Sequence, residues 1–155
     1  MAPEIRPVTK DNWQELIKLK VREDQKHFVA SNLYSIAQVQ FGDDYAGHWN
    51  LHAFGIYEGD APVGFFMYGY DFEYPKQQAF IFRLMVDEKY QGKGFGRFAM
   101  KKMLEVFRTD ERIAHVGISY ESENDVARKL YAGLGFMETG EILGEETLAV
   151  LKIRS

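Results

Sequence analysis

The chain has 155 residues, a formal net charge of −4, and 46% hydrophobic and 15% aromatic residues. This length and composition exclude a disordered chain and predict one well-packed domain spanning residues 1–155. There is no cysteine, which excludes disulfides, thiolate metal sites and a cysteine nucleophile. The negative charge argues against general nucleic-acid binding, which favours basic surfaces.

No apolar run approaches the ~20 residues of a membrane span. The first residues, 1–6, also lack the apolar core of a signal peptide, so we expect a cytoplasmic protein that does not bind membranes. The four histidines, His27, His48, His52 and His115, do not fall into a ligand spacing on one predicted helix. The sequence therefore predicts no metal site.

The N-terminal third alternates between strand and helix patterns. Residues 5–8 predict a strand, and Thr9 or Asp11 is expected to cap a helix that continues to Leu19. A second helical stretch, residues 23–40, is interrupted near residues 31–32, and a polar loop follows at residues 42–47.

Three strand patterns occupy the centre of the chain. Residues 51–57 and 63–70 predict an antiparallel pair joined by a hairpin turn at residues 58–62. A turn at residues 74–76 precedes a third predicted strand, residues 79–86. This third strand leads directly to a glycine-rich loop.

The loop is the run Tyr90-Gln91-Gly92-Lys93-Gly94-Phe95-Gly96-Arg97. Glycines at alternate positions let a loop bring its backbone N–H groups close to an anion, and the helix that follows adds the positive end of its dipole. The spacing differs from a nucleotide P-loop and from a Rossmann fingerprint. The pattern therefore predicts a phosphate cradle of another kind, and the alternative is a glycine-rich turn without a ligand.

Helix and strand patterns continue to the end of the chain. The helix after the loop carries one apolar face, made of Ala99, Met100, Met103, Leu104 and Phe107. Residues 115–120 predict a strand, a helix containing Tyr131 follows, and closing strands are expected from Phe136 and over residues 147–151.

The second motif is the run from Ser122 to Phe136. We expect Ser122 to cap a helix, because Asp125 stands three residues later, as in a capping box. Gly133 and Gly135 then end the helix. An apolar stripe runs along it, made of Val126, Ala127, Leu130 and Tyr131.

These two motifs resemble those of the GCN5-related N-acetyltransferases (GNAT). Gln91, Gly94 and Gly96 fill the family's acetyl-CoA loop pattern, and the run from Asn124 through Leu-Tyr to Leu-Gly-Phe is similar to its next conserved block. The resemblance covers essentially the whole chain. It implies an α/β (α+β) fold, with a mixed, mostly antiparallel sheet flanked by helices in the order β-α-α-β-β-β-α-β-α-β-β.

The resemblance implies acetyl-CoA as cosubstrate. It places residues Leu84, Met85 and Val86 beside the pantetheine arm and gives Asn124 a hydrogen bond to that arm. It assigns the pyrophosphate to Gln91, Gly92, Lys93, Gly94, Phe95, Gly96 and Arg97. The alternatives are ordinary exposed charge for Lys93 and Arg97, and a helical first-turn residue without a ligand for Asn124.

Tyr131 corresponds to the tyrosine that many members of the family place beside the sulfur of CoA. A phenol can protonate the departing thiolate as a general acid, and the alternative is a core tyrosine. The sequence does not identify the general base that would deprotonate the amine. Asp71, Glu73, His48 and His52 are candidates, while Phe82 occupies the position where human-type polyamine acetyltransferases carry a glutamate.

The acceptor is indicated by a further resemblance. Residues 23–38 are similar to a segment of bacterial spermine/spermidine acetyltransferases. Spaced carboxylates and aromatic faces suit a polycation, and the candidates are Glu23, Asp24, Tyr34, Trp49 and Glu73, together with Asp43, Asp44 and Tyr45. The alternative is a solvated helix face for the acids and core positions for the aromatics.

The sequence thus predicts an N-acetyltransferase that moves acetyl directly from acetyl-CoA to a primary amine of a polyamine such as spermidine or spermine. Three alternatives stay open: a peptide or protein acetyltransferase, an enzyme for another small amine such as an aminoglycoside, and a catalytically silent acyl-CoA sensor. Proteins of this fold often pair as homodimers, and no residue of the sequence marks an interface.

Overall fold

The computed structural model describes residues 2–42 and 47–154. Its elements are β1 (Pro3–Pro7), α1 (Trp13–Leu16), the 3₁₀ helix η1 (Glu23–Phe28), α2 (Asn32–Phe41), β2 (Asn50–Glu58), β3 (Ala61–Tyr70), β4 (Ala79–Val86), the 3₁₀ helix η2 (Glu88–Tyr90), α3 (Phe95–Arg108), β5 (His115–Tyr120), α4 (Asp125–Gly133), β6 (Met137–Leu143) and β7 (Glu146–Lys152). This order confirms the predicted one. The acceptor candidates Asp43, Asp44 and Tyr45 lie outside the described residues.

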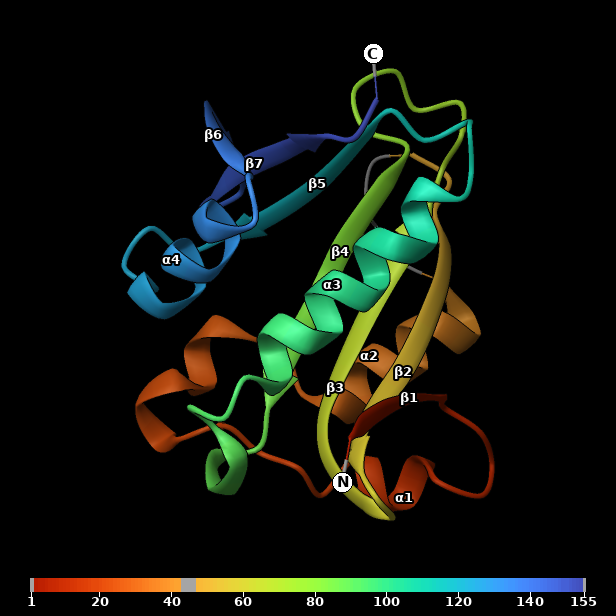
Figure 1. Cartoon of the computed structure of the whole chain (residues 1–155), viewed down its shortest axis with the longest axis vertical. Helices are drawn as coiled ribbons and strands as arrows, with labels where there is room; N and C mark the ends of the chain where they lie inside the picture. Colours follow the sequence, from red (N-terminus) through yellow and green to blue (C-terminus); the bar gives the residue numbers. More distant parts are fainter. Residues whose placement is uncertain (1, 43–46, 155) are drawn as a thin grey trace.

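The strands form one sheet in the order β1-β2-β3-β4-β5-β7-β6. Neighbouring strands are antiparallel, except that β4 and β5 pair in parallel. Helix α3 crosses one face of the sheet, and α1 and α2 lie on the opposite face (Figure 1). The structure therefore confirms the predicted mixed, mostly antiparallel sheet flanked by helices.

Alternation along β3 builds the core on both faces of the sheet, because successive strand side chains point in opposite directions. Phe66 and Tyr68 are buried in the larger cluster, under α3. Phe65 and Met67 are buried in the smaller cluster, to which α2 contributes Ile36. The central strands are thus covered on both sides, which fixes the site-bearing β4 in place.

Helix α3 buries the apolar stripe that the sequence predicts. Ala99, Met100, Met103, Leu104 and Phe107 all lie in the core. In the part of the chain that the structure describes, no helix has both the length and the apolar run needed to cross a bilayer.

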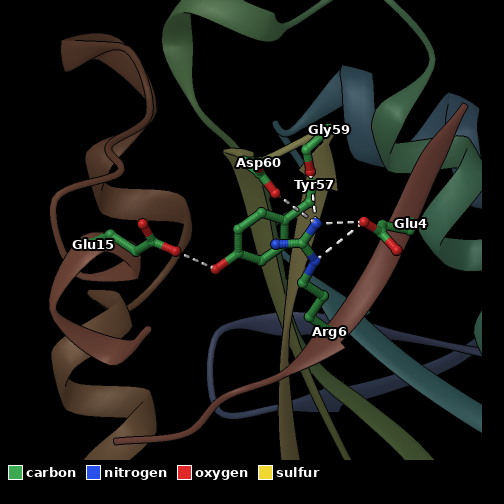
Figure 2. A network of polar contacts seen from close by, with 6 residues as sticks. All are labelled: Glu4, Arg6, Glu15, Tyr57, Gly59 and Asp60. Atoms are coloured by element: carbon green, nitrogen blue, oxygen red, sulfur yellow. Dashed lines mark hydrogen bonds and ion pairs between the residues drawn. The ribbon is translucent and has the colours of Figure 1, made fainter. Parts of the chain in front are cut away.

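Tyr57 of β2 anchors α1 to the sheet (Figure 2). Its hydroxyl donates a 2.6 Å hydrogen bond to Oε1 of Glu15, and the Arg6 guanidinium lies 4.3 Å from the centre of its ring. Arg6 also donates to the carbonyl oxygen of Gly59 at 2.8 Å, in the hairpin between β2 and β3. One buried ring thereby connects β1, α1 and the first hairpin.

Helix α1 differs from the sequence prediction at both ends, since neither Thr9 nor Asp11 is its N-cap and it stops before Leu19. Helix α1 has Asn12 at its N-cap and ends at Leu16, since Lys18 N–H and Leu19 N–H bond to carbonyls three residues back and tighten the chain into 3₁₀ turns. The second stretch is interrupted as predicted, because Ser31 caps α2 by accepting a 3.1 Å bond from Tyr34 N–H.

The expected cap of α4 at Ser122 was wrong. A tight turn follows β5, in which Asn124 N–H bonds to the carbonyl of Glu121 at 2.9 Å. The helix therefore begins at Asp125, and the Oδ1 atom of Asn124 caps it by accepting a 3.3 Å bond from Ala127 N–H.

Candidate active site

The site begins where β4 and β5 separate. Their parallel pairing joins Ala79 to Val116 and ends at Ile81 and Ile118, although β4 continues to Val86. The two strands diverge from this point (Figure 1). The free edge of β4 can therefore offer backbone hydrogen bonds to an extended ligand that lies between the strands.

A bulge stands at the start of this opening. Met67 of β3 faces Arg83, whereas Tyr68 faces Ile81, so Phe82 is the extra residue on β4. Bulges bend a strand and redirect its side chains. Phe82 is also the position at which a glutamate base is absent from this sequence, and its side chain lines a cavity beside the opening.

The glycine loop leads from β4 into α3 with the backbone that the motif implies. Gly92 and Gly94 have φ values of 77° and 89°, which favour glycine, and Gly94 is the N-cap of α3. No side chain caps this helix, and its first hydrogen bond is donated by Phe98 N–H to the carbonyl of Gly94. The N–H groups of residues 95–97 are thus left without intrahelical acceptors, as an anion site requires.

A groove of about 560 Å³ runs from this loop along the free edge of β4. Its lining includes most of the expected cofactor residues, namely Leu84, Met85, Val86, Gln91, Gly92, Gly94, Phe95, Gly96, Arg97 and Asn124. Lys93 lies outside this lining, with its Nζ atom 5.6 Å from the centre of the Tyr90 ring. We call this groove the cofactor groove.

Gln91 holds the loop against its surroundings. Its Nε2 atom donates to the carbonyl of Val86 at 3.0 Å and to Oε1 of Gln25 at 2.8 Å. The side-chain amide group therefore ties the loop to the end of β4 and to η1. Arg22, immediately before η1, adds a cation to the lining that the motif did not predict.

Asn124 stands at the other wall of the groove. Its Oδ1 atom is used by the helix cap, which leaves its amide nitrogen for another acceptor. Its side chain also lines the cavity next to the groove.

Tyr131 lines both the cofactor groove and a neighbouring cavity, from the buried face of α4. Its side chain is 7% exposed and packs against Tyr120 and Phe136, with ring centres 5.5 and 6.1 Å away. Burial raises the pKa of its phenol, and the charges of Tyr120 and Glu146 add to this effect. Among the residues that the structure describes, none hydrogen-bonds to the hydroxyl, so this phenol keeps its proton and has it available to donate.

A second cavity, of about 450 Å³, adjoins the groove. The two share part of their lining, namely Phe28, Val29, Leu84, Asn124, Ala127 and Tyr131. We call it the acceptor cavity, since a nucleophile must approach the reacting end of the groove from outside it. Ser119 and Glu146 also line it, and the Ser119 hydroxyl donates a 2.7 Å hydrogen bond to Oε1 of Glu146.

A third cavity, of about 390 Å³, lies beyond the acceptor cavity. The two share Phe82, Arg83, Ser119 and Glu146. We call it the distal cavity. Trp49, one of the expected acceptor residues, lines it together with Tyr74.

The other expected acceptor residues do not line these three cavities. Glu23 pairs with Lys26 at 2.8 Å, and Asp24 lies 3.4 Å from Arg22. Tyr34 of α2 is 58% exposed, and Glu73 is exposed next to Asp71.

The base candidates of the sequence also lie outside the three linings. Asp71 accepts the backbone N–H groups of His48, at 2.8 Å, and of Glu73, at 3.1 Å, so it orders a loop. His52 packs against Tyr68 and Tyr70, and burial lowers its pKa.

Sequence reasoning missed Glu146, which lines both the acceptor and the distal cavity. Glu146 is the first residue of β7, and no motif distinguishes it from the neighbouring Glu145. The structure also brings together His27, Glu121 and Glu123, with their potential ligand atoms within 4.8 Å of one another. His27 and Glu123 are exposed, and exposed groups of this kind often lie together without an ion.

A family pattern and a similar protein of known name both point to the same family of acetyltransferases. The pattern of the acetyltransferase (GNAT) family matches residues 13–136. The chain is 30% identical over 146 residues to the spermine/spermidine N(1)-acetyltransferase of Bacillus subtilis (strain 168), which covers 92% of each chain.

Two solved structures share the fold. PaiA N-acetyltransferase from Thermoplasma acidophilum, in complex with coenzyme A, has a TM-score of 0.70 at 18% identity and covers 98% of this chain and 99% of its own. Spermidine N-acetyltransferase from Vibrio cholerae, in complex with CoA and spermine, has a TM-score of 0.71 at 17% identity, over 97% and 95%. A sheet that opens between β4 and β5, a glycine loop at the N-terminus of α3 and a match over most of the chain establish that this protein belongs to the GNAT family of acetyltransferases.

Proposed function

We propose that this acetyl-CoA-dependent N-acetyltransferase transfers the acetyl group to a primary amine of a polyamine such as spermidine or spermine. The observation that carries the proposal is the 30% identity, over 92% of both chains, with a relative named for these two acceptors. A match that covers 92% of the chain includes most of the segments that line the three cavities.

The N-terminus of α3 suits the pyrophosphate. We assign it to the backbone N–H groups of residues 95–97, with Arg97 and Arg22 supplying positive charge along the groove. A backbone cradle brings the phosphates close to the helix end, where the dipole contribution is largest. Gln91 acts here by holding the loop in position through Val86 and Gln25.

The free edge of β4 suits the pantetheine arm, whose amides need hydrogen-bond partners. We assign this role to the backbone of residues 84–86 and to the amide nitrogen of Asn124. The arm would then direct the thioester toward Tyr131, where the cofactor groove meets the acceptor cavity.

Tyr131 supplies the proton that the leaving thiolate needs. The lone pair of the neutral amine forms the new C–N bond, the C–S bond breaks, and the thiolate takes the phenolic proton. The nitrogen loses a proton as the amide forms, which restores the phenol through water. Because the acceptor begins as an ammonium ion, one further proton is released to solvent in each cycle.

The alternatives make different demands on the same site. A peptide or protein acceptor, or another small amine, would use the same cofactor groove and the same Tyr131, and would differ only in what fills the acceptor side. A silent acyl-CoA sensor would bind the cosubstrate and show no turnover.

The test is thiol release from acetyl-CoA by the purified protein. The acceptor panel contains spermidine, spermine, putrescine, an aminoglycoside and a lysine peptide. We expect release with spermidine or spermine far above the rate with the aminoglycoside or the lysine peptide. Turnover of the aminoglycoside or the peptide alone would refute the proposal, and acetyl-CoA binding by calorimetry without turnover would favour the sensor.

A further inference from the structure

Shared lining residues place the three cavities next to one another, in a row that starts at the cofactor groove. Tyr131 belongs to the groove and to the acceptor cavity, and Glu146 belongs to the acceptor cavity and to the distal cavity. The acceptor cavity therefore lies between the cofactor groove and the distal cavity, so an acceptor longer than a monoamine would extend from Tyr131 toward Glu146. A small monoamine would leave that space empty.

The distal cavity is built from aromatic rings in mutual contact. Trp49 lies 5.3 Å from Tyr74, 6.0 Å from Phe80 and 5.5 Å from Phe82, measured between ring centres, and all four residues line the cavity. The faces of aromatic rings attract cations, and indole attracts them most strongly. A group of rings that lines a cavity can therefore present aromatic faces to a cation.

Glu146 gives this aromatic cavity a negative charge. One oxygen accepts from Ser119, and in the described part of the chain no Lys, Arg or His lies within ion-pair distance of the carboxylate. Glu141, the other acid in the lining, is already paired with Lys76 at 2.8 Å. Of the two acids in this lining, Glu146 is thus the one without a basic partner among the described residues.

Arg83 adds a positive charge to the same lining, and neighbouring groups hold its guanidinium in position. Its guanidinium donates to the carbonyl oxygen of Phe82 at 2.8 Å and to Oε1 of Gln38 at 3.1 Å. Gln38 belongs to α2, so the second of these bonds connects the guanidinium to that helix.

We propose that the distal cavity binds a second cationic nitrogen of the acceptor, between the rings of Trp49, Tyr74 and Phe82 and the carboxylate of Glu146, while the reacting nitrogen lies at Tyr131. The inference rests on the proposed function, because it requires an amine that reacts at Tyr131. It goes further by naming the feature that the enzyme selects, which is a second positive charge separated from the reacting amine by an alkyl chain.

The test compares Glu146→Gln with Glu145→Gln. Gln keeps an oxygen that can accept from Ser119, so the fold is expected to survive. Glu145 is exposed in the turn before β7 and lies outside the cavity linings, so its variant removes the same charge from the neighbouring position. A second variant, Trp49→Leu, removes the indole face and keeps an apolar side chain.

Steady-state kinetics are measured with spermidine, putrescine and butylamine. We expect Glu146→Gln to raise the KM for spermidine roughly 10- to 100-fold, as for the loss of a hydrogen bond to a charged group. We expect Trp49→Leu to raise it about 3- to 30-fold. Butylamine kinetics should stay within about threefold in both variants, and Glu145→Gln should match the wild type.

Calorimetry of spermidine with the CoA-loaded protein separates this inference from the proposed function. Turnover that Glu146→Gln leaves unchanged would overturn the inference and keep the polyamine function. Spermidine binding that depends on Glu146, without turnover, would refute the function and keep the cation site. Equal losses of kcat for spermidine and butylamine in Glu146→Gln, with a shifted pH profile, would make Glu146 a general base and overturn the inference. Absence of both spermidine binding and spermidine turnover in the wild type would refute both proposals.

Discussion

The hydroxyl of Tyr131 can be removed with little other change to the protein. Tyr131→Phe deletes one oxygen that no described residue hydrogen-bonds, while the ring contacts to Tyr120 and Phe136 stay. We therefore expect the free energy of unfolding to change by less than about 1 kcal/mol. The affinity for acetyl-CoA should also be little changed, since the proposed phosphate and pantetheine contacts lie elsewhere in the groove.

The effect on turnover should be much larger. A positioned general acid contributes roughly 10²- to 10⁴-fold, which corresponds to about 3–5 kcal/mol of activation free energy. The assay is kcat for spermidine, measured by thiol release, together with calorimetry for acetyl-CoA. Tyr120→Phe is the control, because it removes a neighbouring hydroxyl that donates to Glu138 at 2.9 Å.

The pH profile gives a second check on the same residue. The phenol acts in its protonated form, and burial raises its pKa above the ordinary value of about 10. The acid therefore stays competent as the pH rises from 6 to 10, so kcat should show no descending limb in that range. A Tyr131→Phe enzyme with wild-type kcat, or an equal loss in Tyr120→Phe, would remove Tyr131 from the mechanism.

Three further substitutions test the cofactor groove and the framework around it. Gly94→Asp should abolish acetyl-CoA binding in calorimetry, because it puts a negative charge in the proposed phosphate cradle. Gly140→Asp controls for backbone strain, since Gly140 has a similar φ of 86° and also has open space around it. Equal acetyl-CoA binding by the two variants would refute the cradle. Asn124→Ala should lower the free energy of unfolding by about 1 kcal/mol and weaken acetyl-CoA binding. Asn124→Ser should restore the helix cap and the melting temperature of the protein without restoring the affinity for acetyl-CoA. Full recovery of that affinity in Asn124→Ser would leave the residue only a structural role. Tyr57→Phe should cost about 1–2 kcal/mol of unfolding free energy in urea, since it removes the hydrogen bond to Glu15, and an unchanged transition would show that this contact does not hold α1.

Local patterns were sufficient for most of the fold. The nearly continuous apolar run over residues 79–86 and the apolar stripe from Ala99 to Phe107 each depend on nearby residues, so their strand and helix could be predicted from sequence. The ends of α1 and α4 could not be predicted in the same way. At both places several residues that can cap a helix stand close together, and the turn after the preceding strand decides where the helix begins. Helix α1 begins after Asn12, whose side chain makes no cap hydrogen bond, and α4 begins after Asn124, whose side chain does.

The cofactor groove was predictable for a related reason. Its phosphate end is a contiguous run, residues 91–97, in which the glycine positions and the helix start are visible in the sequence itself. Arg22 escaped prediction because it reaches the groove only when η1 folds against the loop, through the contact between Gln25 and Gln91. Nothing near Arg22 in the sequence indicates that contact.

The acceptor side is assembled almost entirely by tertiary structure. Trp49 precedes β2, Tyr74 follows β3, Phe82 is the bulge on β4, and Glu146 opens β7. The chain brings these residues together only because β7 pairs with β5, next to the point where β5 leaves β4. A glutamate on β4 would be visible as part of a motif, whereas an acid donated by β7 is indistinguishable from Glu145 until the sheet is formed. If these residues bind the acceptor as we propose, acceptor specificity in this chain depends on strand order, which explains why a sequence can identify the acetyl donor well and the amine poorly.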